Sequence, residues 1–128
     1  MIDVLVIDDD PGIRRLLGRV LTGAGYQVRE ATNGVDGIAA FRTQRPALVI
    51  TDIVMPEKEG IEIIREIRQE APGAAILAIS GSDPHGDLYL HAATSLGADA
   101  ALAKPFRPHE LLAVVADLLS GAPIPDES

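Results

Sequence analysis

The sequence predicts an α/β domain in which helices cover both faces of a parallel sheet. Short apolar runs alternate along the chain with segments whose apolar residues recur at helical spacing, so that five strand–helix units follow one another. This alternation is typical of parallel strands joined by right-handed crossovers. In addition, four of the apolar runs end in an acidic, hydroxyl or lysine residue, and open α/β sheets bind ligands at that carboxyl edge.

Five apolar runs, bounded by turn-forming residues, are the expected strands. Four of them are almost wholly apolar, as strands buried on both faces should be. The second run is more polar, which places it at or near an edge of the sheet. The expected strands comprise residues 2–7, 26–31, 47–51, 75–79 and 99–103.

Capping and breaking residues set the limits of the helices between these strands. Pro11 suits the first turn of the first helix, which Gly23 and Gly25 end, and Asn33 caps the second helix. In the third helix the isoleucines form the apolar side, and Arg68 belongs to the solvated side. The expected helices comprise residues 11–23, 33–41, 60–71, 87–96 and 111–119.

The composition indicates one acidic domain. The chain has 128 residues, 47% of them hydrophobic, and we expect one domain over 1–120 followed by a flexible acidic tail over 121–128. The net charge of −8 argues against direct binding to nucleic acid, and no apolar run is long enough to cross a membrane. The chain lacks cysteine and a signal peptide, from which we expect a cytoplasmic, single-domain protein.

Three consecutive aspartates follow the first expected strand, and a fourth aspartate, Asp52, follows the third expected strand. Asp10 is suited to cap the next helix, which leaves Asp8 and Asp9 to approach Asp52 at the carboxyl edge of the sheet. Grouped carboxylates repel one another unless a cation lies among them, and Mg²⁺ prefers carboxylate, water and phosphate oxygens. We therefore expect Mg²⁺ at Asp8 and Asp9, with Asp52 as a candidate nucleophile that forms an aspartyl phosphate.

Two further polar residues follow the fourth and fifth strands. Ser80 and Lys104 each have an ordinary explanation when taken alone, as a loop serine and a surface lysine. Lys104 is more specific, because the chain has only two lysines and this one lies between a buried strand and Pro105. At the same edge as Asp52, an ammonium group can neutralise a phosphoryl group and pair with the carboxylate.

Jointly, these residues resemble the receiver (CheY-like) domain of two-component response regulators over essentially residues 1–120. The resemblance implies a flavodoxin-like, doubly wound sheet of five parallel strands in the order 2-1-3-4-5, with five helices on both faces. The strings that carry the resemblance are residues 4–11, 51–56, 80–81, 97–99 and 104–106.

The resemblance also implies the partners and the metal ligands. Asp52 would accept a phosphoryl group from the phosphohistidine of a sensor histidine kinase or a phosphotransfer protein. Asp8, Asp9 and Asp52 would hold Mg²⁺ together with the backbone carbonyl of Val54. Such a domain would catalyse only its own phosphorylation and dephosphorylation, and it would signal by binding a downstream protein that the sequence does not name.

The remaining site residues match the family pattern, with two departures. Ser80 would hydrogen-bond the phosphoryl group, Lys104 would pair with it, and the bond from Lys104 to Pro105 would be cis.

Receivers often carry Tyr or Phe three residues before this lysine, whereas this chain has Ala101, so the usual aromatic switch cannot operate. The loop after Ser80 is also longer than is common. We expect the signal to leave through residues 81–90.

A haloacid-dehalogenase-type phosphatase is the competing interpretation. Asp8-x-Asp10 after an apolar strand fits the nucleophile motif of that family, with Ser80 and Lys104 as later motifs. Asp52 would then have no role, the chain is short for the family, and the acids expected after the lysine are missing. A pseudo-receiver that binds a partner without phosphorylation is a third possibility, which the intact acidic set disfavours.

Overall fold

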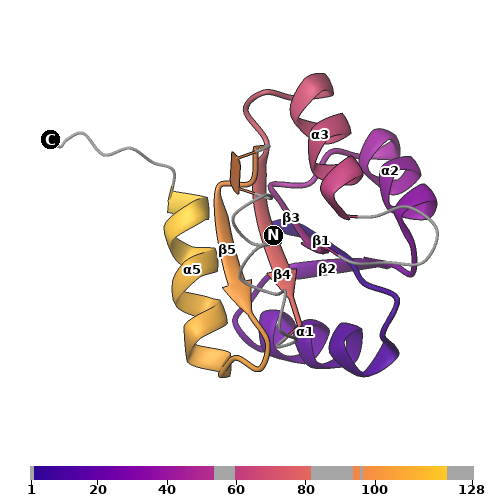
Figure 1. Ribbon diagram of the computed structural model, residues 1–128. Coiled ribbons are helices and arrows are strands. Elements are labelled where there is room, and N and C mark those ends of the chain that lie inside the picture. Colours follow the sequence, from indigo (N-terminus) through magenta and orange to yellow (C-terminus); the bar gives the residue numbers. More distant parts are fainter. Residues whose placement is uncertain (1, 54–59, 82–93, 96, 121–128) are drawn as a thin grey trace, which may run out of the picture.

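The computed structural model describes residues 2–53, 60–81, 94–95 and 97–120, and it contains the predicted parallel sheet (Figure 1). The strands are hydrogen-bonded in the order β2-β1-β3-β4-β5, and all four pairings are parallel. The more polar strand β2 is at an edge, as its composition predicts. The strands are β1 (Asp3–Ile7), β2 (Gln27–Ala31), β3 (Leu48–Asp52), β4 (Ala75–Ser80) and β5 (Ala100–Ala103).

Four helices lie within the described residues: α1 (Pro11–Gly23), α2 (Gly34–Thr43), α3 (Gly60–Glu70) and α5 (Pro108–Ser120). The predicted caps are present, because the side chains of Asp10 and Asn33 accept hydrogen bonds from the first turns of α1 and α2. The helix expected over 87–96 and the tail expected over 121–128 lie almost wholly outside the described residues. None of the described helices is both long and apolar enough to span a membrane.

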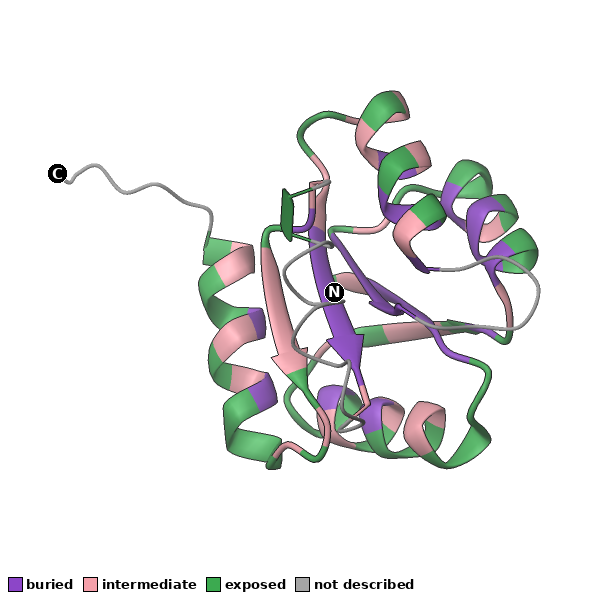
Figure 2. Cartoon of the chain, viewed as in Figure 1, coloured by how far each residue is buried: buried purple, intermediate pink, exposed green. Residues whose placement is uncertain are grey.

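The helices form one layer on each face of the sheet, and alternate residues of the central strands belong to one core cluster or the other. In β1, for example, Leu5 and Ile7 pack with α2 and α3, whereas Val4 and Val6 pack with α1 and α5. Figure 2 shows β4 buried along most of its length. The central strands are therefore buried on both faces, which accounts for their continuous apolar sequence.

Several strand limits differ by one residue from the prediction, and two of the differences lie at the carboxyl edge. Asp52 is part of β3 and pairs with Ile79, and Ser80 is part of β4 and pairs with Ala103. Strand β5 begins at Ala100, one residue later than predicted. The carboxylate of Asp99, the residue before it, accepts the backbone N–H of Ile76. The backbones of Asp52 and Ser80 are consequently held by the sheet ladder.

Arg68 is not solvated as its helix position predicts, and this expectation was wrong. Its guanidinium donates to the carbonyls of Gly97, Pro72 and Ala74 and to the carboxylate of Asp99, at distances from 2.6 to 3.0 Å. These partners belong to the connections before β4 and β5, so a single side chain ties the end of α3 to both. Helical periodicity predicts which side of a helix is apolar and which is polar. It does not predict which loops of the fold lie against the polar side.

Candidate functional site

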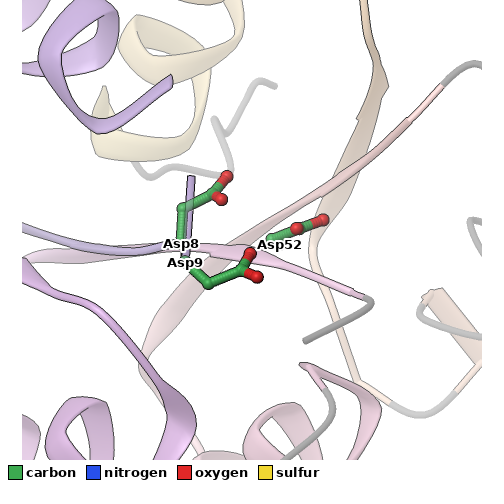
Figure 3. Close-up of side chains that lie close together, drawn as sticks. All are labelled: Asp8, Asp9 and Asp52. Atoms are coloured by element: carbon green, nitrogen blue, oxygen red, sulfur yellow. The ribbon is translucent and has the colours of Figure 1, made fainter. Parts of the chain in front are cut away.

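Asp8, Asp9 and Asp52 form one acidic cluster at the carboxyl edge of the sheet (Figure 3). Asp8 and Asp9 follow β1, and Asp52 is the last residue of the neighbouring strand β3. Each side chain contributes an oxygen to a group in which all the atoms lie within 4.8 Å of one another. The predicted convergence of these three residues is therefore present in the fold.

Asp8 is buried and is held from several directions. Its backbone N–H donates to the carbonyl of Ala31 at 3.1 Å, and its Oδ1 accepts the backbone N–H of Asp10 at 2.9 Å. Burial is the main cause that raises the pKa of the Asp8 carboxyl, while the Asp10 N–H and the nearby Lys104 oppose that shift. The folded protein thus contains a carboxylate whose charge is incompletely compensated.

Asp10 lies beside the cluster and has the structural role predicted for it. Its Oδ1 accepts the backbone N–H of Gly12 at 2.8 Å, which caps α1. The cap fixes the first turn of α1 directly after the segment that carries Asp8 and Asp9.

Asp52 is held at the end of β3 by a close contact with α3. The backbone N–H of Gly60 donates to the carbonyl of Ile53 at 2.7 Å, and a Cβ atom at position 60 would overlap the carbonyl oxygen of Asp52. Only glycine permits this approach, because it has no side chain. The sequence marks Gly60 as the start of a helix but does not reveal this contact, which depends on how α3 docks.

Ser80 and Lys104 complete the site from the two strands on the other side of Asp52. The hydroxyl of Ser80 is buried and has no hydrogen-bond partner among the described residues. Lys104 Nζ lies 3.3 Å from Asp8 Oδ2 and 3.8 Å from Asp52 Oδ2, so the ammonium group bridges two acids and is nearer to Asp8 than to the expected partner. The bond from Lys104 to Pro105 is cis, as the family resemblance implies.

The donor set of the cluster fits a hard divalent cation. Three carboxylates converge, two of them buried, and only one lysine lies between them within the described part of the chain. Oxygen ligands of this kind suit Mg²⁺, which keeps several waters and is bound through a few carboxylates plus phosphate. Val54, whose carbonyl is an expected ligand, lies outside the described residues, so that ligand stays a prediction.

Asp8→Asn is expected to stabilise the metal-free protein at neutral pH by on the order of 1 kcal/mol, because it removes a buried charge. A raised pKa means that the folded state binds more protons than the unfolded chain as pH falls. The stability contribution of Asp8 is therefore lost as pH rises through its folded pKa, and the advantage of Asp8→Asn should vanish on acidification toward the pKa of free aspartate.

The measurement is urea unfolding in EDTA over a range of pH, with Asp9→Asn as the control that removes an exposed charge from the same cluster. Asp9→Asn should gain less stability than Asp8→Asn. Saturating Mg²⁺ should reverse the order of parent and Asp8→Asn, because a ligand stabilises the form that binds it. If Asp8→Asn is less stable than the parent in EDTA at pH 7, the negative charge of Asp8 is already fully compensated by Lys104 and the Asp10 N–H.

Fold and site together define a doubly wound α/β domain with an acidic cluster, a lysine and a buried hydroxyl at the carboxyl edge of its sheet. The family model for the response regulator receiver domain matches residues 4–116. The chain belongs to this family, the receiver domains of two-component response regulators. The dehalogenase-type alternative has no support from the match.

Sequence relatives agree with this assignment. The chain is 37% identical over 121 residues to the transcriptional regulatory protein GltR of Pseudomonas aeruginosa, a match that covers 93% of this chain and 49% of GltR. It is 34% identical over 116 residues to the alkaline phosphatase synthesis transcriptional regulatory protein PhoP of Bacillus subtilis, covering 91% of this chain and 48% of PhoP. The chain thus spans about half the length of the curated relatives it matches.

A solved structure shows the same fold over nearly the whole chain. The receiver domain of NtrX from Brucella abortus superposes with a TM-score of 0.89 at 29% identity. The superposition covers 94% of this chain and 100% of that domain. The strand order implied by the resemblance is therefore confirmed by the sheet and by this neighbour.

Proposed function

We propose that this receiver domain accepts a phosphoryl group on Asp52 from the phosphohistidine of a sensor histidine kinase or a phosphotransfer protein. The observation that carries the proposal is the buried Ser80 hydroxyl, which lacks a hydrogen-bond partner among the described residues. Ser80 ends β4, at the same edge of the sheet where Asp52 ends the neighbouring strand β3. A buried hydroxyl without a partner costs about 1–3 kcal/mol. A phosphoryl oxygen on Asp52 would supply the missing partner.

The transfer requires only groups that this site contains. An oxygen of Asp52 attacks the phosphorus, a new P–O bond forms, and the P–N bond to the donor histidine breaks with its electron pair left on the imidazole. Lys104 Nζ, 3.8 Å from Asp52 Oδ2, is placed to pair with the negative charge of the transferred group. Positioning and charge stabilisation of this kind account for most phosphoryl-transfer catalysis.

The acidic cluster would hold Mg²⁺ during this reaction. Asp8, Asp9 and Asp52 are the ligands proposed from the described residues, with the carbonyl of Val54 as a further one. When bound, Mg²⁺ supplies positive charge to the phosphoryl oxygens, which three carboxylates would otherwise repel. On this proposal the domain catalyses only its own phosphorylation and dephosphorylation and acts on no other substrate.

The proposed partners follow from the same site. The donor is a sensor histidine kinase or a phosphotransfer protein, the domain would act in the cytoplasm, and the phosphorylated form would bind a downstream protein. We propose no direct contact of this domain with nucleic acid or membrane, because the chain has a net charge of −8.

Ala101 packs against the core on the side of α2 and α3 and has no ring to reorient. Of the expected output segment, residues 81–90, all but Gly81 lie outside the described residues.

Ser80→Ala is expected to slow phosphorylation by acetyl phosphate by about tenfold or more, because it removes a hydrogen bond that only the phosphorylated state makes. The same change should leave stability unaltered or raise it by about 1 kcal/mol, since the lost hydroxyl is unpartnered. Thr51→Val is the matched control for stability. Its buried hydroxyl donates to the Asp52 carbonyl at 3.0 Å, so its loss should cost about 1 kcal/mol.

Both variants are compared by urea unfolding and by the initial rate of phosphate incorporation. A parental labelling rate in Ser80→Ala would contradict the proposed hydrogen bond between Ser80 and the phosphoryl group. Labelling of Asp8 in place of Asp52 would return the dehalogenase-type chemistry to consideration.

A further inference from the structure

Arg14, on the first turn of α1, contacts the backbone that carries the acidic cluster. Its Nη1 donates to the backbone carbonyl of Asp8 at 2.8 Å, and its Nε donates to Glu30 Oε1 on β2 at 3.3 Å. The Arg14 side chain is only 17% exposed, so most of its surface is covered by the protein. The guanidinium therefore joins α1, the edge strand and the end of β1.

The Asp8 carbonyl belongs to the peptide group that links Asp8 to Asp9. A planar peptide moves as one unit, so a restraint on its carbonyl also restrains the position of the N and Cα atoms of Asp9, from which the side chain leaves the backbone. Arg14 thus acts on the placement of the Asp9 side chain, although it contacts neither carboxylate of this pair.

Asp9 depends on this restraint more than the other acids do. Asp8 has its own N–H held by Ala31 and its carboxylate held by Asp10 and Lys104. The Asp9 carboxylate is exposed and makes no hydrogen bond to another described residue, although it belongs to the cluster. Within the described structure, its position in the cluster is set by its backbone.

We propose that Arg14, anchored by Glu30, is a positioning residue for the divalent cation, holding the peptide between Asp8 and Asp9 so that the Asp9 carboxylate faces Asp52. The inference rests on the proposed function, because it assigns a role at the same metal site. Groups that orient metal ligands without touching the metal commonly contribute tenfold to a hundredfold in metal affinity.

Charge alone predicts the opposite effect. A guanidinium close to the cluster repels an incoming cation, so its removal should strengthen Mg²⁺ binding if Arg14 acts only through its charge. If Arg14 positions Asp9, its removal should weaken Mg²⁺ binding. The sign of the change in Kd therefore separates the two roles.

The test compares Arg14→Met with Arg29→Met. Methionine keeps an unbranched apolar stem of similar length and removes every donor. Arg29 is a matched control, because it also pairs with a carboxylate, that of Asp3, and donates to two backbone carbonyls, those of Ala40 and Gln44. Its carboxylate partner begins β1, at the opposite end of the strand from Asp8.

Mg²⁺ affinity is measured by isothermal titration calorimetry of the metal-free protein in about 0.1 M KCl, which screens distant charges. Urea unfolding in EDTA gives the stability of each variant separately. Arg14→Met should bind Mg²⁺ about tenfold more weakly than the parent. Arg29→Met should keep the parental Kd within about twofold, whatever its loss of stability, because it is remote from the cluster.

Equal or tighter Mg²⁺ binding by Arg14→Met would overturn the inference while leaving the metal site intact. A parent that binds no Mg²⁺, or an Asp9→Asn variant with parental affinity, would overturn the metal site itself and the inference with it. If Arg14→Met does not fold, Arg14→Lys decides, because lysine keeps the positive charge but cannot donate to the Asp8 carbonyl and to Glu30 in the same geometry. Weaker binding in Arg14→Lys supports the inference, and an unchanged Kd contradicts it.

Discussion

Asp52→Asn should abolish phosphorylation by acetyl phosphate in the presence of Mg²⁺. The side-chain amide has nearly the shape of the carboxylate but lacks the negative oxygen that attacks phosphorus. The loss should be complete, because Asp8 is buried beneath Lys104 and Asp10 is engaged in capping α1. No described acid other than Asp9 is then both close to the site and accessible, and Asp9 is the proposed metal ligand.

The modified residue is identified by borohydride reduction of the acyl phosphate followed by peptide mass spectrometry. Asp10→Asn is the matched control, because asparagine also caps helices and the change removes the same charge from the same edge. Asp10→Asn should label at close to the parental rate. Urea unfolding should show that Asp52→Asn is folded, since the change relieves repulsion within the acidic cluster. Full labelling of a folded Asp52→Asn would refute the assignment.

Gly60→Ala should destabilise the protein by about 2–4 kcal/mol, a large effect for the addition of one methyl group. A Cβ at this position would overlap the carbonyl oxygen of Asp52 and lie 2.6 Å from the Cα of Ile53, and both of these are backbone atoms. Neither can move without shifting the end of β3 or detaching the start of α3. The same displacement should lower the labelling rate, because Asp52 ends that strand.

Gly23→Ala is the control for this prediction. Gly23 also lies in a helix, in the last turn of α1, and a Cβ there meets no atom within 4 Å. Alanine should therefore stabilise the protein by up to about 1 kcal/mol, through its higher helix propensity. Chemical denaturation and acetyl phosphate labelling of both variants give the comparison. Equal stability of Gly60→Ala and the parent would show that α3 docks on β3 less closely than described here.

The acidic cluster could be predicted from sequence because it depends on strand ends. Parallel strands end at a common edge, so Asp8, Asp52, Ser80 and Lys104, which end or follow four of the strands, are expected at that edge. The cap at Asp10 is equally local. The strand order, by contrast, came from the family resemblance, since alternation of strands and helices alone is compatible with several orders.

The apolar pattern determined the fold class of this protein, and the polar residues that follow the runs determined which carboxylates gather at the carboxyl edge. The tertiary structure alone decided that Lys104 is nearer to Asp8 than to Asp52, that Gly60 touches the Asp52 carbonyl, and that Arg14 and Arg68 bind backbone carbonyls. Periodicity specifies which side of an element is apolar, through the local geometry of the chain. Contacts between elements depend on the angle and depth at which they pack, and those are set by all the side chains of the core together.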